Sequence, residues 1–299
     1  MDRSKTFLIV GLGLLGGKYA QVLSGKGYRV LGIDTDPDAV AYARRRDYIV
    51  EGLAGGDPAP LLAQADYVIF GLYPTALLQW VEACGHLLHP GTLVTDVSGV
   101  KRGVVEPVQD RLPQGVEFIA SHPMAGRETS GITHSAEVDF APANFIITPT
   151  EQNSPEAVAW CRALAETLGF ARITTLSVAE HDRMIGYVSQ LCHAIAVSLM
   201  CASDNSSLAD YTGDSFRDLT RIARINEKLW AELILWNRDN LIGEIDMFDA
   251  ALQKLRGCLV NDDRAGLEGM FRLSTARRAA FDKKQNEPAG AAADRQPEH

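Results

Sequence analysis

The histidine in the segment Ser121-His122-Pro123-Met124-Ala125-Gly126 is the first candidate for acid–base chemistry. It directly follows a strand-like run, residues 116–120, and therefore falls at the carboxyl end of a strand, where α/β folds place their ligands. Neutral imidazole has a pKa suited to taking a proton near neutrality, and an alcohol must lose its hydroxyl proton when a hydride leaves its carbon. The sequence thus predicts His122 as the base of an alcohol oxidation. A turn histidine that binds a loop backbone would look the same in this fragment.

A glycine-rich turn near the N-terminus is typical of a dinucleotide site. Gly11-Leu12-Gly13-Leu14-Leu15-Gly16 directly follows an apolar run and opens a helical pattern. In that setting the first glycine makes a tight turn, the second admits a pyrophosphate and the third allows close packing of the helix. Free N–H groups at the start of the helix would bind the phosphates. The alternative is an ordinary strand-to-helix turn.

The carboxylate of Asp34 ends the second predicted strand, 18 positions after Gly16. A carboxylate there accepts hydrogen bonds from both ribose hydroxyls and repels a 2′-phosphate, which predicts NAD as the cofactor. Three arginines on the following helix, residues 44–46, could neutralise a phosphate, so NADP is not excluded, although a solvated helix face explains them as well. Leu72 and Tyr73, at the end of another strand on the same sheet edge, are predicted to line the cofactor.

Polar side chains share one face of a helix that we expect over about residues 178–200. Asp182, Ser189 and His193 lie at helical spacing beside an apolar stripe, which indicates a helix that lines a cleft. A hydrogen-bond network between domains would give the same pattern. From the residues alone we favour that network for His181.

A cluster of arginines follows further along the chain. Arg217, Arg221 and Arg224 fall on one face of an expected helix, and Asp218 is placed to pair with Arg221. Such a cluster is usually a solvated surface, and it becomes a carboxylate site only where a cleft faces it. Trp230, beyond it, is expected to pack in a core or a subunit contact.

Two kinds of scaffold must position these side chains. In the first half, apolar β-rich runs alternate with helical patterns, which is typical of a Rossmann-type, doubly wound parallel sheet. The expected strands cover residues 7–10, 28–33, 67–72, 92–97, 117–120, 144–148 and, at the sheet edge, 171–176. Beyond residue 177 the apolar spacing is helical and proline is absent as far as residue 281. We predict a dinucleotide-binding domain over residues 1–176, an all-α helical domain over residues 177–283 and a disordered tail over residues 284–299.

Composition limits the partners of the chain. A net charge of −9 over 299 residues argues against binding to nucleic acid or to an anionic membrane, because both require clustered Lys and Arg. Five cysteines without C-x-x-C spacing suggest neither a metal site nor a disulfide framework. The apolar opening, residues 6–10, is too short for a signal peptide or a membrane span. We therefore expect a cytoplasmic protein without a metal.

Several segments together resemble the prephenate/arogenate dehydrogenase family, the cyclohexadienyl dehydrogenases of tyrosine biosynthesis. They comprise residues 11–16, 96–101, 121–128, 181–182, 189–193 and 216–223, with Trp230 and Asn237 beyond. They occur in the family's order and extend the resemblance from about residue 6 to about residue 281. The His-Pro-Met-Ala-Gly and Thr-Arg-Ile-Ala segments are far more specific than the glycine motif.

The resemblance implies an NAD(P)-dependent dehydrogenation of a CH–CH type with decarboxylation. Prephenate, arogenate or both would be converted to 4-hydroxyphenylpyruvate or tyrosine. By similarity, His122 takes the hydroxyl proton and Arg221 holds the ring carboxylate through its bidentate fork. Further substrate-binding positions implied by the similarity are Glu128, His193 and Asp218. The resemblance also implies a homodimer formed by the helical domain, with Arg217 near the subunit contact.

Two departures from the family pattern concern the substrate side. The family commonly has a substrate-facing serine immediately before a Val-Lys pair, and here that place is Gly99 while the serine is Ser98. Ser98 is a candidate substrate-binding residue whose hydroxyl points elsewhere if the backbone is unchanged. Many members carry His and Pro where this chain has Gln190 and Cys192. The choice between prephenate and arogenate stays open.

Two other classes of function fit parts of the sequence. β-Hydroxyacid dehydrogenases and imine reductases also join a Rossmann domain to a helical one, but they would lack the His-Pro-Met-Ala-Gly segment and usually rely on a lysine in the helical domain. A nucleotide-sensing module would bind the dinucleotide without turnover. Only a short polar segment follows the helical domain, so we expect no fused regulatory domain, and any feedback by tyrosine would act at the active site.

Overall fold

The computed structural model of the protein describes residues 1–280. The chain divides into two compact units, Met1–Glu244 and Ile245–His299. The tail predicted over residues 284–299 lies outside the described residues.

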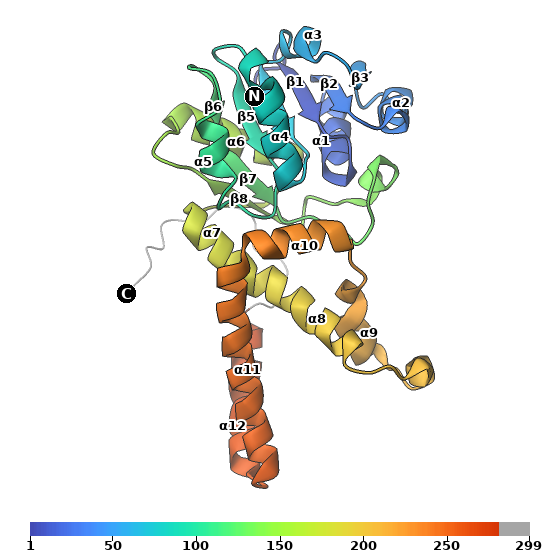
Figure 1. The fold of residues 1–299 in the computed structure, drawn as a ribbon, viewed down its shortest axis with the longest axis vertical. Coiled ribbons are helices and arrows are strands. Elements are labelled where there is room, and N and C mark those ends of the chain that lie inside the picture. Colours follow the sequence, from blue (N-terminus) through green and yellow to red (C-terminus); the bar gives the residue numbers. More distant parts are fainter. Residues whose placement is uncertain (281–299) are drawn as a thin grey trace. The chain divides into compact units, whose positions relative to one another are not determined.

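A six-stranded parallel sheet forms the centre of the first unit (Figure 1). Its strands are β1 (Thr6–Val10), β2 (Arg29–Asp34), β3 (Glu51–Ala54), β4 (Tyr67–Phe70), β5 (Leu93–Asp96) and β6 (Glu117–Phe118). They are ordered β3-β2-β1-β4-β5-β6, which is the order of a doubly wound dinucleotide-binding fold. The Rossmann-type fold expected from the sequence is confirmed. Because the strand order reverses between β1 and β4, a crevice opens between the turns that follow these two strands.

Helices cover both faces of this sheet. They are α1 (Leu14–Gly25), α2 (Pro37–Arg45), α3 (Ala59–Leu62), α4 (Pro74–Cys84), α5 (Val105–Gln109) and α6 (Pro155–Leu168). Strand β1 is buried along its whole length: Phe7 and Ile9 pack in a core with α1 and α6, whereas Leu8 and Val10 pack in a second core with α4 and α5. A strand buried on both faces reads as a continuous apolar run, which is why the sequence marks β1 clearly.

A separate three-stranded sheet carries the histidine segment. Its strands are β7 (Ala120–Pro123), β8 (Asn144–Thr148) and β9 (Arg172–Thr175); β7 is antiparallel to β8, and β8 is parallel to β9. The prediction that residues 144–148 and 171–176 are strands of the parallel sheet was wrong, because they form β8 and β9 of this second sheet. The N–H of Ile119 still donates to Val94 of β5, but the N–H of Ser121 donates to the side chain of Asp96, so the chain leaves the first sheet there. Strand β3 was not predicted, because none of its four residues is fully buried and one of them is Gly52.

Within the described residues beyond β9 there are helices and no strands, as predicted. They are α7 (Val178–Ile185), a π-helical turn (Gly186–Leu191), α8 (Cys192–Cys201), α9 (Asp214–Thr220), α10 (Glu227–Trp236), α11 (Arg238–Val260) and α12 (Arg264–Ala279). Helix α10 is tied to the nucleotide-binding fold, since the carboxylate of Glu232 accepts from the N–H of Thr75 at the start of α4, at 2.6 Å.

The continuous helical run Val178–Cys201 is long and apolar enough to cross a membrane by length and composition. This is weak evidence, because the core helix of a soluble protein passes the same test. The polar side chains of His181, Asp182 and Gln190 in this run are buried and bind groups of other elements. That pattern is typical of a helix packed within a folded protein.

Candidate active site

A cleft of about 1250 Å³ joins the glycine turn, His122 and Arg221. Its walls come from the turn after β1, from the ends of β4 and β5, from β7 and the loop that follows it, and from the helices beyond residue 177. Pockets for single small ligands occupy roughly 300–1,000 Å³, so this cleft has room for a dinucleotide together with a substrate. The structure thus brings together the residues that the sequence marked in both halves of the chain.

The glycine turn fits a dinucleotide. Gly11 has a φ of 93°, and a Cβ at Gly16 would lie 1.9 Å from the carbonyl oxygen of Gly11, so both positions require glycine. A Cβ at Gly13 would meet nothing within 4 Å, which leaves the turn open to the cleft. Gly13 begins α1 without a side-chain cap, so the first N–H groups of the helix are free to bind phosphate oxygens.

Asp34 binds the same turn. Its Oδ2 accepts from the N–H of Leu12 at 2.5 Å and its Oδ1 accepts from the N–H of Asp36 at 2.9 Å. A carboxylate has further lone pairs, and Asp34 lines the cleft, so it can still accept from ribose hydroxyls. The side chain of Leu12 is fully buried, so Leu12 belongs to the turn through its backbone N–H, which binds Asp34.

The remaining cofactor candidates lie where the sequence placed them. Leu14, Leu15, Leu72 and Tyr73 all line the cleft. The three arginines at residues 44–46 do not line it, which agrees with a solvated face of α2.

His122 lies within β7, paired with Ile146, whereas the sequence placed it at the carboxyl end of a strand that closed at residue 120. The preceding residue is held on both sides: the N–H of Ser121 donates to Asp96 Oδ1 at 2.9 Å, and its carbonyl accepts from Lys101 Nζ at 2.6 Å. The backbone beside the imidazole is therefore fixed by buried charged groups. His122 is half-buried on the cleft wall.

The surroundings of His122 keep its imidazole neutral. Burial lowers the pKa of His122 well below its ordinary value of 6.5, and the neighbouring His181 and the charge of Lys101 lower it further. Nδ1 of His122 lies 2.9 Å from Nε2 of His181. A neutral imidazole with one nitrogen bound in this way has the other nitrogen available for a ligand.

On the helical side, His193 packs against Trp230, with ring centroids 3.7 Å apart and ring planes tilted by 32°. His193 Nδ1 donates to the carbonyl oxygen of Ser189 at 3.0 Å, and burial lowers the pKa of His193. The ring therefore offers Nε2 to the cleft as an acceptor. Trp230 also lines the cleft.

Arg221 forms an ion pair with Glu128, which lies in the loop after β7. The pair links the two walls of the cleft. The predicted local partner, Asp218, is exposed on α9 and does not line the cleft, and neither does Arg217. Helix α9 ends before Arg221, so the arginines do not share one helical face, although Arg224 also lines the cleft.

The departures from the family pattern have clear structural consequences. Ser98 borders the cleft, but its hydroxyl binds Asp96 and the carbonyl oxygen of Val100. A Cβ at Gly99 would lie 3.8 Å from His122 Cε1, so this position opens toward the histidine. Gln190 is buried and holds α10, since its Nε2 donates to Leu233 and its Oε1 accepts from Asn237.

A metal site is not apparent in the described part of the chain: no group of three or more His, Cys, Asp or Glu side chains there is placed to hold a metal ion.

The fold and the cleft define a dinucleotide-dependent oxidoreductase that joins a Rossmann-type domain to a helical one. Residues 19–174 match the family described as "Prephenate dehydrogenase, nucleotide-binding domain", and residues 177–273 match "Prephenate dehydrogenase, dimerization domain". The chain belongs to the prephenate dehydrogenase family, and it is an NAD-dependent oxidoreductase.

Relatives of the whole chain carry related names. A prephenate dehydrogenase of Bacillus subtilis is 28% identical over 295 residues, which cover 94% of this chain and 77% of the relative. A cyclohexadienyl dehydrogenase of Zymomonas mobilis is 28% identical over 283 residues, which cover 93% of this chain and 96% of the relative. The crystal structure of prephenate dehydrogenase from A. aeolicus, in complex with hydroxyphenyl propionate and NAD+, superposes with a TM-score of 0.84 at 26% identity, covering 93% and 98%.

Proposed function

We propose that this protein oxidises prephenate, arogenate or both with NAD and releases the ring carboxylate as carbon dioxide. The observation that carries this proposal is the single cleft that joins the glycine turn to His122 and Arg221. The matched relatives are named for prephenate and for cyclohexadienyl substrates, which supports the same substrate class here.

The cofactor would be held by the turn at residues 11–16, by Asp34 and by the cleft wall at Leu72 and Tyr73. Held there, the nicotinamide would supply the acceptor for the hydride of the ring carbon that bears the hydroxyl group. Asp34 favours NAD over NADP, because a 2′-phosphate would meet its carboxylate.

His122 takes the hydroxyl proton on Nε2 as the hydride leaves. The bond between the ring and its carboxylate breaks, carbon dioxide departs, and the electron pair of that bond completes the aromatic ring. The proton on His122 returns to the oxygen, which becomes a phenol. A neutral imidazole can accept that proton because burial lowers the pKa of His122.

Arg221 would bind the ring carboxylate, with two parallel N–H···O bonds from its guanidinium. Glu128 holds that guanidinium in the cleft before substrate arrives. The acceptor nitrogen of His193 lines the same space and would accept a hydrogen bond from the ammonium group of arogenate, whereas the side chain of prephenate has no donor for it. Ser98 and Asp218 have no role in this proposal, because the hydroxyl of Ser98 is bound to Asp96 and Asp218 lies outside the cleft.

We also propose a homodimer of two-domain subunits whose functional boundary lies near residue 176, between β9 and α7. Exposed apolar side chains on α11 support an interface there; they are Ile245, Met247, Phe248, Leu252, Leu259 and Val260. Light scattering of the purified protein tests the dimer, and a monomeric mass would overturn it. We also propose a cytoplasmic location without membrane or nucleic-acid partners, which the negative net charge and the biosynthetic relatives support.

The test of function is turnover with prephenate and with arogenate in parallel, each with NAD and with NADP, followed by the absorbance of the reduced nicotinamide. Turnover with either substrate supports the proposal and identifies the substrate. If neither substrate reacts although NAD binding is measured directly, the proposal fails, and another alcohol or a sensing function replaces it.

A further inference from the structure

Behind His122 lies a chain of three hydrogen-bonding side chains that comes from both halves of the protein. Nδ1 of His122 lies 2.9 Å from Nε2 of His181, and Nδ1 of His181 lies 2.7 Å from Oδ1 of Asp182. The side chains of His181 and Asp182 have no exposed surface. His122 stands on β7, whereas the other two residues stand on α7.

We propose that His181 and Asp182 form a positioning dyad that fixes His122 in one tautomer, with Nδ1 protonated and the lone pair of Nε2 directed to the substrate. The proposal rests on the role of His122 as the base. His181 and Asp182 act through His122 and do not touch the substrate.

The direction of the hydrogen bonds follows from Asp182. Its Oδ1 accepts from the N–H of Lys101 at 2.9 Å, and its Oδ2 accepts from the N–H of Arg102 at 2.7 Å. Both of its oxygens therefore act as hydrogen-bond acceptors toward the backbone, including the oxygen that faces His181. His181 Nδ1 must therefore donate to Asp182.

The tautomer of His122 follows in the same way. A neutral imidazole has one donor and one acceptor, so Nε2 of His181 is an acceptor when its Nδ1 donates. His122 must then donate from Nδ1 to His181. The lone pair of its Nε2 remains, which is the atom that the proposed reaction requires.

Burial keeps both rings neutral in the resting state. It lowers the pKa of His181, against which the hydrogen bond to Asp182 raises it. The charged groups around the dyad are Asp182 itself, the buried pair of Lys101 and Asp96, and Arg102, whose side chain is exposed. When His122 takes the substrate's proton, the positive charge that it gains is stabilised by the oriented donors and acceptors that end at the carboxylate.

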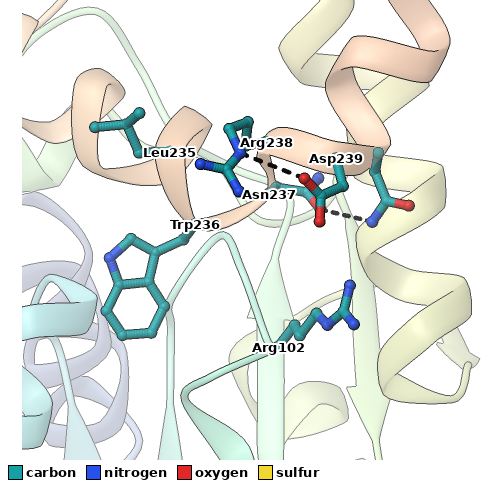
Figure 2. A pocket seen from close by; sticks show the side chains of 7 residues that line it. Arg102, Leu235, Trp236, Asn237, Arg238 and Asp239 are labelled. Carbon is teal, nitrogen blue, oxygen red and sulfur yellow. Dashed lines mark hydrogen bonds and ion pairs between the residues drawn. The ribbon is translucent and has the colours of Figure 1, made fainter.

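The dyad is fixed by the elements around it. Helix α7 begins with a capping box between Ser177 and Glu180, which sets the start of the helix and so the direction of the next turn. Asn237, at the junction of α10 and α11, donates to the carbonyl oxygen of Asp182 at 2.8 Å. A small hollow of about 140 Å³ lies next to Asn237 and is also lined by Arg102 (Figure 2). Arg238 and Asp239, which form an ion pair, line the same hollow.

The direct test is the protonation state of the ring nitrogens in the full-length protein, measured by 15N NMR with the signals assigned by single substitutions. The expected result is an unprotonated Nε2 and a protonated Nδ1 for His122, and a protonated Nδ1 for His181. A wild-type His122 protonated on Nε2 at neutral pH overturns the proposal. This measurement needs no turnover, so its outcome is independent of the proposed reaction.

Two substitutions separate positioning from packing. His181→Phe keeps the ring volume and removes the acceptor, and we expect kcat to fall by roughly two to four orders of magnitude with NAD binding unchanged. His181→Gln keeps an amide oxygen that can accept from His122 Nδ1, and it should retain more activity than His181→Phe. If His181 only fills space, His181→Phe should retain more activity than His181→Gln, and that result would overturn the proposal.

The control is His86→Phe, at an exposed histidine outside the cleft, which should leave turnover unchanged. His122→Asn separates this inference from the function on which it rests. If His122→Asn retains full activity, the base assignment fails. If His122→Asn is inactive while His181→Phe retains wild-type kcat, the dyad alone fails.

Discussion

Lys101 Nζ lies 2.7 Å from Asp96 Oδ2, and neither side chain has any exposed surface. The same ammonium group donates to the carbonyl oxygen of Ser121 at 2.6 Å, next to His122. Burial lowers the pKa of Lys101, and the attraction of Asp96 opposes that shift. This buried ion pair therefore joins the end of β5 to β7 and sets the position of the proposed base.

Removing the cation should destabilise the fold. Lys101→Met leaves the carboxylate of Asp96 buried without its ion-pair partner, which costs about 3–5 kcal/mol in such settings. Urea denaturation measures the loss in the free energy of unfolding. Lys5→Met is the matched control, because Lys5 forms an ion pair with Asp66 that is open to solvent, and its loss should be clearly smaller. If both variants lose the same free energy of unfolding, the buried ion pair stabilises the fold no more than the exposed one.

The pH dependence of catalysis should reflect the environment of His122. The base must be neutral to act, and burial lowers the pKa of His122 well below 6.5. We therefore expect kcat/KM to stay constant as the pH falls through the ordinary imidazole range. We expect the acidic limb of the profile below pH 6.5 in the wild type. His122→Asn should lower kcat by roughly two to four orders of magnitude and abolish that limb. An acidic limb at or above pH 6.5 would contradict the assignment of His122 as a neutral, half-buried base.

Arg221 should act mainly in substrate binding. Arg221→Ala removes the bidentate donor for the ring carboxylate, and we expect a KM raised by about tenfold or more, with NAD binding unchanged. Arg162→Ala, on the exposed face of α6, is the control and should leave KM unchanged. Steady-state kinetics decide, and an unaltered KM in Arg221→Ala removes this residue from the site.

The sequence could predict the parts of the site that depend on neighbouring residues. The strand β1, the glycine turn and Asp34 follow from an apolar run, glycine spacing and a strand end, all within the first 34 residues. Of the polar face predicted for the helix beyond residue 177, Ser189 and His193 line the cleft, whereas Asp182 is buried and binds the backbone N–H groups of Lys101 and Arg102. The network between domains that we expected for His181 is present, since it binds His122 across 59 positions of the chain.

The parts that depend on distant residues could not be predicted. Helical spacing offered Asp218 as the partner of Arg221, but α9 ends before Arg221 and the partner is Glu128, 93 positions away. Residues 120–123 have the pattern of a strand in either sheet, and their position depends on distant partners: Ser121 N–H donates to the side chain of Asp96, and the strand pairs with β8. Periodicity gives the face of an element and leaves its neighbour undetermined.

Two glycines of the same turn should respond to alanine in opposite ways. A Cβ at Gly16 would lie 1.9 Å from the carbonyl oxygen of Gly11 and would force α1 away from β1, so Gly16→Ala should destabilise the fold. A Cβ at Gly13 meets nothing within 4 Å, so Gly13→Ala should fold normally and fill only the space that a pyrophosphate would enter. Thermal unfolding without ligand and calorimetric NAD binding distinguish the two. Since the stability of Gly13→Ala is expected to be that of the wild type, an NAD affinity that is also unchanged would mean that the dinucleotide does not lie against this turn.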